Sequence, residues 1–587
     1  GIAAALDIKL PARFFWQVYR AVLGKEQVPE SSPFDRPLLT WRLMRLLPEL
    51  LTEPVFAPLA RFLKDDGDMR KLHQLAQRLA DLFDQYQVYR ADWLEDWGNG
   101  RDVLRTSRKG SEPLPENLLW QPELWRALLA DVPQHEQNTS RAALHQRFLH
   151  HAQTISEDQR PAGLPARLVV FGISSLPRQS LEVLAVLGRW TQVLMCVHNP
   201  CEHYWGNIIA DKDLLRAERA RQLRKPGMPE VIADDALHQH AHPLLAAWGK
   251  QGRDYIGLLD EYDQRERYES LLTPVISRID LFNANGEDSL LHQLQEDIRD
   301  LRPLAETKER WPALDVQHDD SLRFYITHSA QREVEVLHDR LLAALAADPT
   351  LKARDIIVMV PDINGYAPHI QAVFGLMERS DPRYIPFTVA DQGPRQNNSL
   401  LGALESLLEL PQSRFAVSDL LDLLDVPSVR QRFGIEEEQL PLLHRWIRAA
   451  NVRWGLHAEQ RQSLELPLSS EQNSWFFGLQ RMLLGYAVGS GEAWENIEPL
   501  DEIGGLDAAL IGPLSHLLSC LDDTWRQLRE PVAPAVWGER LRAILSQYFA
   551  EDDGEDGFIL VRLHGELETW LEACESVNLQ AELPLSV

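Results

Sequence analysis

Two short apolar runs, RLVVFGI at residues 167–173 and TQVLMCV at residues 191–197, decide the fold class of this chain. Nearly continuous apolar runs of this length are typical of strands that lie buried in a parallel sheet. The segment from Leu181 to Leu187 separates them and has the apolar pattern of a helix. A strand, a short helix and a second strand in this order predict a βαβ unit.

A second alternation of strand and helix patterns follows further along the chain. Ser329 is of a residue type preferred at helix N-caps and stands directly before a helical stripe. The two blocks together indicate an α/β protein with two cores in tandem. In the second block we expect strands at 322–327, 355–360 and 386–389, and helices at 331–345 and 366–374.

Helical segments surround both cores, an arrangement that suits helicase-like motor proteins. Apolar side chains recur at helical spacing in most of these segments. The expected helices are Pro11 to Leu23, Leu38 to Leu51, Asp68 to Trp97, a charged helix from Leu214 to Lys225, an amphipathic one from Leu290 to Leu304, and most of the chain after Leu400. We expect a linker at Trp311 to Asp315 and an acidic break at Glu551 to Asp556.

The composition is that of an ordinary globular protein with several domains. Of 587 residues, 44% are hydrophobic and 25% are charged, and no apolar run is long enough to span a bilayer. Four cysteines in this length do not form a disulfide framework, so a reducing cytoplasm is expected. The start lacks the basic leader of a signal peptide. Because the first residue is not methionine and the end shows no obvious stop signal, we expect a piece of a longer protein.

The formal net charge of −27 argues against a chain coated in DNA phosphates, because phosphate contacts come from Lys and Arg. A local basic channel inside an acidic body remains compatible with this charge. Residues 212–225 contain six basic side chains against two acidic ones. This segment could contact phosphate or a partner, or could be a solvated charged helix, and the sequence favours neither interpretation.

The motifs of an ATPase motor or a nuclease are not found in this sequence. A phosphate-binding GxxxxGK[ST] loop is absent, since Gly24-Lys25 and Gly249-Lys250 lack the upstream glycine and the following Ser or Thr. The first strand ends in Ser174-Ser175 rather than in acidic residues that hold Mg²⁺. Glu306 and Lys308 have the spacing of a nuclease motif but stand outside any expected strand, so a structural role is favoured.

Two groups of cysteines and histidines invite a metal interpretation that the spacing does not favour. Cys196, His198, Cys201 and His203 are closer together than the ligands of zinc fingers, and strand alternation points only the first two to one face. A strand end followed by a turn is the simpler interpretation. His238, His240 and His242 are expected to lie together on a surface loop.

Several long stretches resemble the family of the gamma subunit of exodeoxyribonuclease V, the RecC family. They occur in the order of the family and cover nearly the whole chain. The stretches are ADLFDQYQVYRADWL (80–94), HNPCEHYWG (198–206), PLLAAWGKQGRDYI (243–256), QREVEVLHDR (331–340), RDIIVMV (354–360), IQAVFG (370–375) and WFFGLQRMLLGYA (475–487).

The resemblance implies an α/β fold with two tandem, RecA-like parallel-sheet cores of the superfamily 1 helicase type and large helical insertions. It implies a helical part of the first helicase-like domain at 1–160, the rest of that domain at 161–316, a second α/β domain at 317–399 and an incomplete helical domain at 400–587. The motor function of such a chain is expected to be lost.

The resemblance also implies the partners and the activity of a larger complex. The expected partners are DNA, as a duplex end and a 3′-ended single strand, and the beta subunit (RecB) and alpha subunit (RecD) of exodeoxyribonuclease V. The chain is expected to channel the 3′-ended strand and to recognise Chi in double-strand-break repair by recombination. No cofactor is expected in this chain, because ATP and Mg²⁺ are used by the partner subunits.

Seven side chains are candidates for contact with DNA. Trp16 could stack on a base, although core packing is the better interpretation from sequence alone. Carboxylates one helix turn apart could accept hydrogen bonds from base amino groups, although a solvated helix face is the simpler interpretation. Arginines could bind phosphate or a guanine edge, although a surface ion pair is the simpler interpretation. The resemblance places all seven along the Chi-reading part of the strand channel: Leu10, Trp16, Asp81, Leu82, Asp84, Arg90 and Arg141.

Two alternatives remain open at this level. The chain could be a truncated active helicase or helicase–nuclease of the same superfamily, which a GxxxxGK[ST] loop upstream of these residues would favour. It could also be a purely structural scaffold whose acidic surface docks the beta subunit.

Overall fold

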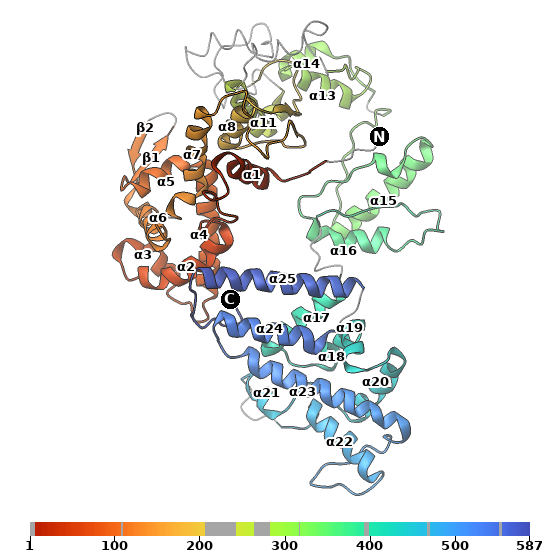
Figure 1. Ribbon diagram of the computed structural model, residues 1–587. Helices are drawn as coiled ribbons and strands as arrows, with labels where there is room; N and C mark the ends of the chain where they lie inside the picture. The colour runs from red at the N-terminus through yellow and green to blue at the C-terminus, as the bar shows by residue number, and fades with distance from the viewer. Residues whose placement is uncertain are drawn as a thin grey trace. The chain divides into compact units, whose positions relative to one another are not determined.

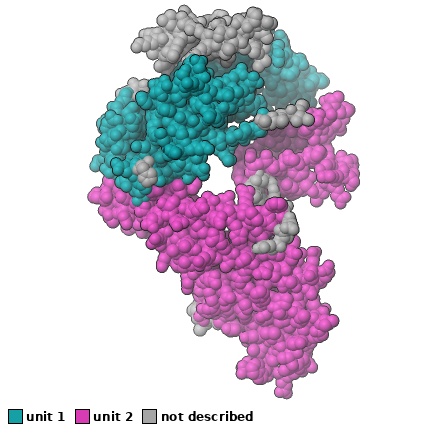
Figure 2. Space-filling model, in the orientation of Figure 1, with its two compact units in different colours: residues 1–36, 80–325 teal, residues 37–79, 326–587 magenta. Residues whose placement is uncertain are grey.

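The computed structural model describes residues 6–106, 110–134, 136–205, 242–262, 282–315, 317–391, 398–465, 470–550 and 554–587 (Figure 1). The chain divides into two compact units, coloured separately in Figure 2. Unit 1 contains residues 1–36 and 80–325, and unit 2 contains residues 37–79 and 326–587. Among the described residues, no helix combines the length and the apolar composition that crossing a bilayer requires.

Unit 1 is mainly helical and contains both regular sheets of the described chain. The antiparallel pair β1–β2 is a short hairpin, and the pair β3–β4 is parallel. The elements of unit 1 are α1 (Pro11–Leu23), α5 (Ala91–Gly98), β1 (Val103–Thr106), β2 (Gly110–Pro113), α6 (Trp120–Asp131), α7 (Arg141–Thr154), β3 (Arg167–Val170), α8 (Arg178–Leu187), β4 (Gln192–Met195), α10 (Pro243–Trp248), α11 (Lys250–Glu261), α13 (Leu290–Arg299) and α14 (Leu304–Arg310), with 3₁₀ turns η2 (Glu116–Leu118) and η3 (Gln137–Thr139).

The βαβ unit predicted from the two apolar runs is confirmed, but the expected burial of its strands is wrong, since exposed and half-buried residues alternate in both and Val169 and Leu194 are exposed. Strands β3 and β4 pair in parallel with Arg167 opposite Gln192 and Val170 opposite Met195, and α8 connects them. Helices α1, α7 and α8 share one hydrophobic core with this sheet, built around Tyr19, Phe148 and Leu184. The apolar stripe of α1 is buried here, as its helical spacing predicts.

The segment expected as one helix from Asp68 to Trp97 is divided at Arg90. Helix α4 (Arg70–Tyr89) ends before this residue and α5 begins after it, because Arg90 has a non-helical backbone with φ −137° and ψ 43°. The apolar stripe continues across the break, so sequence periodicity alone does not reveal it.

A polar triad joins α1, α7 and α8 within the core of unit 1. The hydroxyl of Tyr19 and Nδ1 of buried His145 lie 3.0 Å apart, and Nε2 of His145 lies 2.7 Å from Glu182 Oε2. The bond with His145 is the largest influence on Glu182 and holds the pKa of its carboxyl below the usual 4.5, although burial opposes it. Burial, reinforced by the charge of Glu182, raises the pKa of Tyr19 far above its ordinary value.

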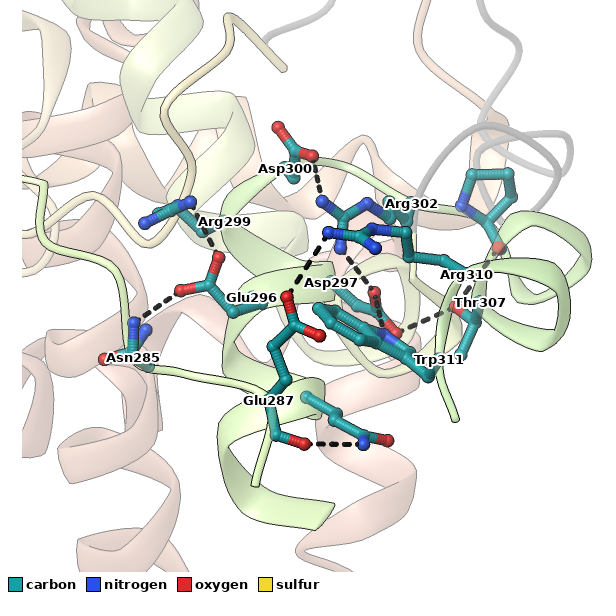
Figure 3. Close-up of polar contacts among 12 residues, drawn as sticks. Asn285, Glu287, Glu296, Asp297, Arg299, Asp300, Arg302, Thr307, Arg310 and Trp311 are labelled. Carbon is teal, nitrogen blue, oxygen red and sulfur yellow. Dashed lines mark hydrogen bonds and ion pairs between the residues drawn. The ribbon is translucent and has the colours of Figure 1, made fainter. Parts of the chain in front are cut away.

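A second buried polar network holds α13 and α14 together, and its centre is Asp297, whose residue is 1% exposed (Figure 3). Oδ1 of Asp297 accepts hydrogen bonds from the indole of Trp311 at 2.7 Å and from Arg302 at 3.2 Å. Oδ2 accepts from the hydroxyl of Thr307 at 2.9 Å. A buried carboxylate is stable only with such donors. Asp297 therefore determines how α14 and the residues on either side of it pack against α13.

The network changes the interpretation of two segments predicted as loops. Trp311, expected to begin a linker, is anchored by Asp297, and the guanidinium carbons of Arg302 and Arg310 lie 5.0 and 5.1 Å from its ring centre. The turn after β4 is tied to the end of α13, because the amide of Glu202 donates to Arg299 O at 2.9 Å.

The helices of unit 2 come from two separated parts of the chain. Residues 37–79 lie with the C-terminal helices, as the edge contact of Trp41 with Trp570 and the bond from Arg45 Nε to Val577 O at 2.8 Å show. The elements are α2 (Arg36–Leu50), η1 (Pro54–Phe56), α3 (Ala57–Phe62), the first half of α4, α15 (Ala330–Ala347), η5 (Ala353–Asp355), α16 (Ile363–Phe374), α17 (Ser399–Leu408), η7 (Leu410–Gln412), α18 (Val417–Leu424), α19 (Pro427–Phe433), η8 (Glu437–Gln439), α20 (Leu440–Ala449), α21 (Ala458–Gln462), α22 (Trp475–Val488), η9 (Gly505–Leu510), α23 (Ile511–Leu528), α24 (Pro534–Tyr548) and α25 (Glu555–Ser576).

The second block confirms the predicted helices but contains none of the three predicted strands. Ser329 caps α15 as expected, since its hydroxyl accepts from the amide of Arg332 at 3.3 Å. Residues 322–327, 355–360 and 386–389 include no strand, and Phe324, Ile326 and Met359 are almost fully exposed. Of the two α/β cores expected in tandem, the described chain therefore forms parallel strands only in the first.

The reason for this difference is that a strand needs a partner. Apolar, β-branched composition favours an extended chain. A regular strand exists only where a neighbouring segment completes its hydrogen bonds, and composition cannot specify that neighbour.

The helical character predicted after Leu400 is confirmed. Large aromatic side chains fill this part of unit 2, and several have polar partners: Trp475 Nε1 donates to Phe415 O at 2.9 Å, and the hydroxyls of Thr524 and Tyr548 lie 2.9 Å apart. Helix α22 packs closely on the loop that follows it, because a Cβ at Gly485 would lie 2.0 Å from Leu500 O. The start of the acidic break, at 551–553, lies outside the described residues.

We predict that Asp297→Asn destabilises the α13–α14 region by about 1–3 kcal/mol, because it leaves buried donors without a charged acceptor. Hydrogen exchange of the amides of α13 and α14 should accelerate accordingly. Asp315→Asn removes an exposed carboxylate paired with His318 and is the control. It should change the opening free energy derived from hydrogen exchange by less than about 0.5 kcal/mol. Equal exchange in the two variants would contradict the structural role of Asp297.

We predict that Glu182→Gln destabilises unit 1 by about 1–2 kcal/mol at neutral pH and by progressively less as the pH falls below about 4.5. A carboxyl whose pKa is lowered by folding contributes stability above its unfolded pKa of about 4.5 and loses it as the pH falls through the folded pKa. The urea midpoint of α7 and α8, read by pulsed hydrogen exchange at a constant labelling pH, measures this difference.

The control for Glu182→Gln is Glu157→Gln, which removes the same charge from an exposed ion pair with Arg189. A destabilisation by Glu182→Gln that did not change with pH would show that its origin is steric rather than ionic.

Candidate nucleic-acid interface

A fully buried amide, Gln87, brings together the elements that carry most of the candidate residues. Its Nε2 donates to Phe34 O at 2.9 Å, and its Oε1 accepts from the backbone amide of Arg141 at 3.2 Å. Its own carbonyl accepts from the side chain of Gln179 at 3.1 Å. The end of α4, the loop before α2 and the beginnings of α7 and α8 therefore meet at one residue.

This junction assembles what we call the polar cluster: Asp35, Arg36, Asp81, Asp84 and Arg141. Arg141 lies between two carboxylates, 3.2 Å from Asp35 and 3.4 Å from Asp84. Arg36 lies 3.4 Å from Asp81. All five side chains are partly exposed, so the ion pairs face solvent on one side.

The carboxyl of Asp84 is the most perturbed group of the polar cluster. Burial raises its pKa, the neighbouring acids Asp35 and Asp81 raise it further, and the guanidinium of Arg141 opposes the shift. Its Oδ1 is buried and forms no hydrogen bond, although Arg141 lies 3.4 Å away. The carboxylate of Asp84 can therefore accept a further hydrogen bond, and it lies beside other negative charges.

The polar cluster can bind hydrogen-bond donors and acceptors but does not attract phosphate strongly. Three carboxylates against two guanidinium groups leave it with an excess of one negative charge when all are ionised. Carboxylates accept from the exocyclic amino group of cytosine, and a released guanidinium can bind the edge of guanine. Exposed ion pairs contribute little to stability. Replacing one such ion pair by a contact to a base edge therefore costs little free energy.

Leu82 and Leu10 are the two apolar candidate residues. Leu82 is partly exposed on α4 between Asp81 and Asp84. Leu10 precedes α1 as its N-cap residue and is 79% exposed. An apolar side chain that remains exposed can contact the face or the methyl group of a base.

Trp16 and Arg90 are held by other protein groups. The indole of Trp16 donates to Pro29 O at 3.0 Å and packs partly buried against the core of α1 and α7, as the sequence alone favoured. The guanidinium of Arg90 stacks 3.6 Å above the ring of Trp93 and donates to Asp92 at 2.8 and 3.0 Å. It also donates to Arg105 O.

The structure thus brings Asp81, Asp84 and Arg141 into one cluster and places Arg90 in a separate set of contacts on the same unit. Two members of the polar cluster, Asp35 and Arg36, were not among the sequence-predicted residues. They stand more than a hundred positions from Arg141, and no periodic pattern connects them.

The nearest signal for these two residues is the turn that precedes them, Ser31-Ser32-Pro33. Serine and proline are common turn residues, and here the amide of Ser32 donates to the carboxylate of Asp35 at 2.9 Å. The pattern predicts a turn and an acceptor close to it, but it does not predict which distant arginine that acceptor meets.

Three of the residues weighed as metal ligands, Cys201, His203 and His242, are engaged in other contacts. The thiol of Cys201 is buried and donates to Ile298 O at 3.2 Å, and His203 Nε2 lies 3.2 Å from Asp300. His242 caps α10. None of the four cysteines forms a disulfide, and no group of three potential ligands that could hold a metal occurs within the described ranges. His238, His240 and the basic segment 212–225 lie outside the described residues.

Comparison with known proteins assigns the chain to a family. Residues 1–301 match the family described as RecC, N-terminal domain, and residues 397–587 match the RecBCD enzyme subunit RecC fourth domain. Together the matches include the polar cluster and the helices after Asn398.

Three of the relatives that bear the name RecBCD enzyme subunit RecC show the extent of the similarity. The protein of Escherichia coli (strain K12) is 41% identical over 94% of this chain and 49% of its own length. That of Haemophilus influenzae is 35% identical over 99% of this chain and 53% of its own length, and that of Mycolicibacterium smegmatis is 30% identical over 92% and 46%. The chain spans about half the length of these relatives. Because the first family match alone covers more than half of its 587 residues, the chain belongs to the RecC family.

Proposed function

We propose that this chain is the DNA-handling part of a RecC-type subunit that binds and reads one DNA strand without hydrolysing ATP or cleaving DNA itself. It channels the 3′-ended single strand of a broken duplex and recognises Chi. It works with the beta subunit RecB and the alpha subunit RecD in double-strand-break repair by recombination. The E. coli relative is named as a subunit of the RecBCD enzyme, which supports this assignment of partners.

The observation that carries the proposal is the polar cluster. A strand that moves through a protein must be read at its bases without being trapped by its phosphates. A site with more carboxylates than guanidinium groups satisfies this requirement, because it offers acceptors and donors to base edges while adding no net attraction for the backbone. The apolar side chains of Leu82 and Leu10 add contact surface for base faces.

The division of labour with the partners rests on the sequence of the motor motifs. No GxxxxGK[ST] loop occurs in the 587 residues, and β3 is followed by Ser174 and Ser175 rather than by acidic residues. ATP and Mg²⁺ are accordingly assigned to the partner subunits. We regard the β3–α8–β4 unit as part of a RecA-like core of the superfamily 1 type that serves as a scaffold.

We predict that a photoreactive benzoyl-phenylalanine at Leu82 of the full-length subunit, in complex with its partners, crosslinks to the 3′-ended strand of a duplex end. Leu82 is partly exposed on α4 and stands between Asp81 and Asp84 in sequence, and the proposed function places it beside the strand. The same probe at the exposed Phe558 on α25 is the control and should not crosslink. Strand-specific radiolabels identify the product, and labelling of the 5′-ended strand alone would refute the assignment.

We predict that Arg141→Ala reduces the response of the complex to Chi by about tenfold or more while leaving duplex unwinding within about twofold of wild type. A bidentate contact to a base contributes about 1–3 kcal/mol of discrimination, whereas unwinding depends on the partner motors. The measurement compares cleavage of one duplex with and without the Chi sequence that the wild-type enzyme recognises.

Arg147→Ala is the matched control for Arg141→Ala. Arg147 lies on the same helix, and its guanidinium donates to Gln27 rather than to the polar cluster. A Chi response that is equally reduced, or equally intact, in the two variants would rule out a reading role for Arg141.

A further inference from the structure

A cavity of about 320 Å³ opens in unit 2 between the start of α18, one face of α20 and the loop that follows α20. Its apolar wall includes Leu421 and Ile447, and its polar wall includes His444, Arg448 and Arg453. No acidic side chain of the described residues lines it, although the chain as a whole has 87 acidic residues against 60 basic ones. A cavity of this size is at the lower end of the range for small-ligand sites, about 300 to 1,000 Å³.

The backbone determines the positions of His444, Arg448 and Arg453 at the wall of the cavity. His444 and Arg448 are four residues apart on α20, so they share one face of the helix. Arg453 is held by its backbone, since its amide donates to Asn473 O at 2.9 Å and its carbonyl accepts from the amide of Val417 at 3.2 Å. The two guanidinium groups therefore line the cavity from two separate elements, α20 and the loop that follows it.

Within the described part of the chain, neither Arg448 nor Arg453 forms an ion pair, whereas nearby arginines do. Arg445, on the same helix, lies 3.5 Å from Glu502, and Arg430 lies 3.1 Å from Glu437. Nε2 of His444 is buried and has no hydrogen-bond partner among the described residues. The two exposed guanidinium groups are therefore available to a ligand that supplies acceptors, and His444 adds a buried imidazole to the same wall.

The nearest carboxylate does not neutralise the cavity. Asp419, in the first turn of α18, accepts from the amide of Ala416 at 3.2 Å and from the hydroxyl of Ser418 at 3.0 Å. Its oxygens are thus engaged with α18 itself. The hydroxyl of Ser418, which lines the cavity, donates its proton to Asp419. Binding of an anion here depends on the two arginines.

We propose that this cavity binds a phosphate group of a nucleic-acid strand. Guanidinium groups bind phosphate oxygens through paired hydrogen bonds, and two of them on separate elements can hold one phosphate from two sides. The apolar wall of Leu421 and Ile447 accommodates the attached sugar. The choice of a nucleic acid as the source of the phosphate rests on the proposed function, whereas the choice of a phosphate rests on the cavity alone.

The cavity plays a different role from the polar cluster. Contacts to phosphate set affinity and position but carry no sequence information, while contacts to base edges carry it. A phosphate site in unit 2 therefore holds a strand irrespective of its sequence, and it accounts for arginines without acidic partners in an otherwise acidic chain.

The test uses the full-length subunit in complex with its partners and a fluorescein-labelled oligothymidylate as the probe. The double variant Arg448→Gln and Arg453→Gln should bind more weakly than wild type, and the slope of log K against log salt should become shallower by about 0.7, the value for the loss of one phosphate contact. The matched control is Arg445→Gln with Arg526→Gln, which removes the same charge from arginines already paired with acids. Equal slopes for the two double variants would overturn the proposal.

Hydrogen exchange gives a readout that does not depend on the variants. Oligothymidylate should slow exchange in peptides that cover residues 416–424 and 440–453 of the wild-type complex, and inorganic phosphate at millimolar concentration should do the same. Protection by phosphate but not by oligothymidylate would overturn the nucleic-acid source, and protection by polyglutamate alone would overturn it in favour of an acidic protein partner. Protection by neither probe would overturn the site.

The outcome is distinguishable from a failure of the proposed function. A failure of Chi reading or of strand-specific crosslinking at Leu82 leaves the phosphate cavity intact, because the cavity and the polar cluster lie in different units. Conversely, a cavity that does not bind phosphate leaves base reading by the polar cluster unaffected. Both arginines are exposed, so their substitution is expected to leave folding unchanged, which thermal unfolding of each variant verifies.

Discussion

The position of the polar cluster depends on one buried amide, the side chain of Gln87. A buried amide must satisfy its donors and acceptor within the protein, and Gln87 does so with the loop before α2 and the start of α7, while its backbone carbonyl accepts from α8. This constraint brings Arg141 next to Asp84. The triad of Tyr19, His145 and Glu182 adds a second polar link on α7 and α8.

Under the proposed function, the distribution of charge explains how an acidic chain would bind a polyanion. Many arginines of the described chain are paired with carboxylates, so they stabilise the fold and add little attraction for phosphate. The polar cluster has a small excess of acid and suits base edges, whereas the cavity beside α20 has cations without acidic partners and suits phosphate. Separating the two chemistries allows a strand to be held and read at different places, without one strongly basic surface.

Much of the local structure could be predicted, and the errors have identifiable causes. Helical periodicity placed α1, α15 and the helices after Leu400 correctly, because burial of one helix face is recorded directly in the sequence. The break at Arg90 and the absence of strands at 322–327 were not predicted. The first depends on contacts of Arg90 with Asp92 and Trp93, and the second on whether another segment pairs with an extended chain.

The sequence by itself determined the family, the βαβ unit, the lack of motor motifs and the helix faces, because these follow from residue order and local spacing. Only the tertiary structure decided that Asp35 and Arg36 join Asp81, Asp84 and Arg141, that Trp311 is anchored by Asp297, and that Arg448 and Arg453 share a cavity. Partners in hydrogen bonds and ion pairs often stand far apart in the chain, and the folded backbone, not the local pattern, sets the distances between them.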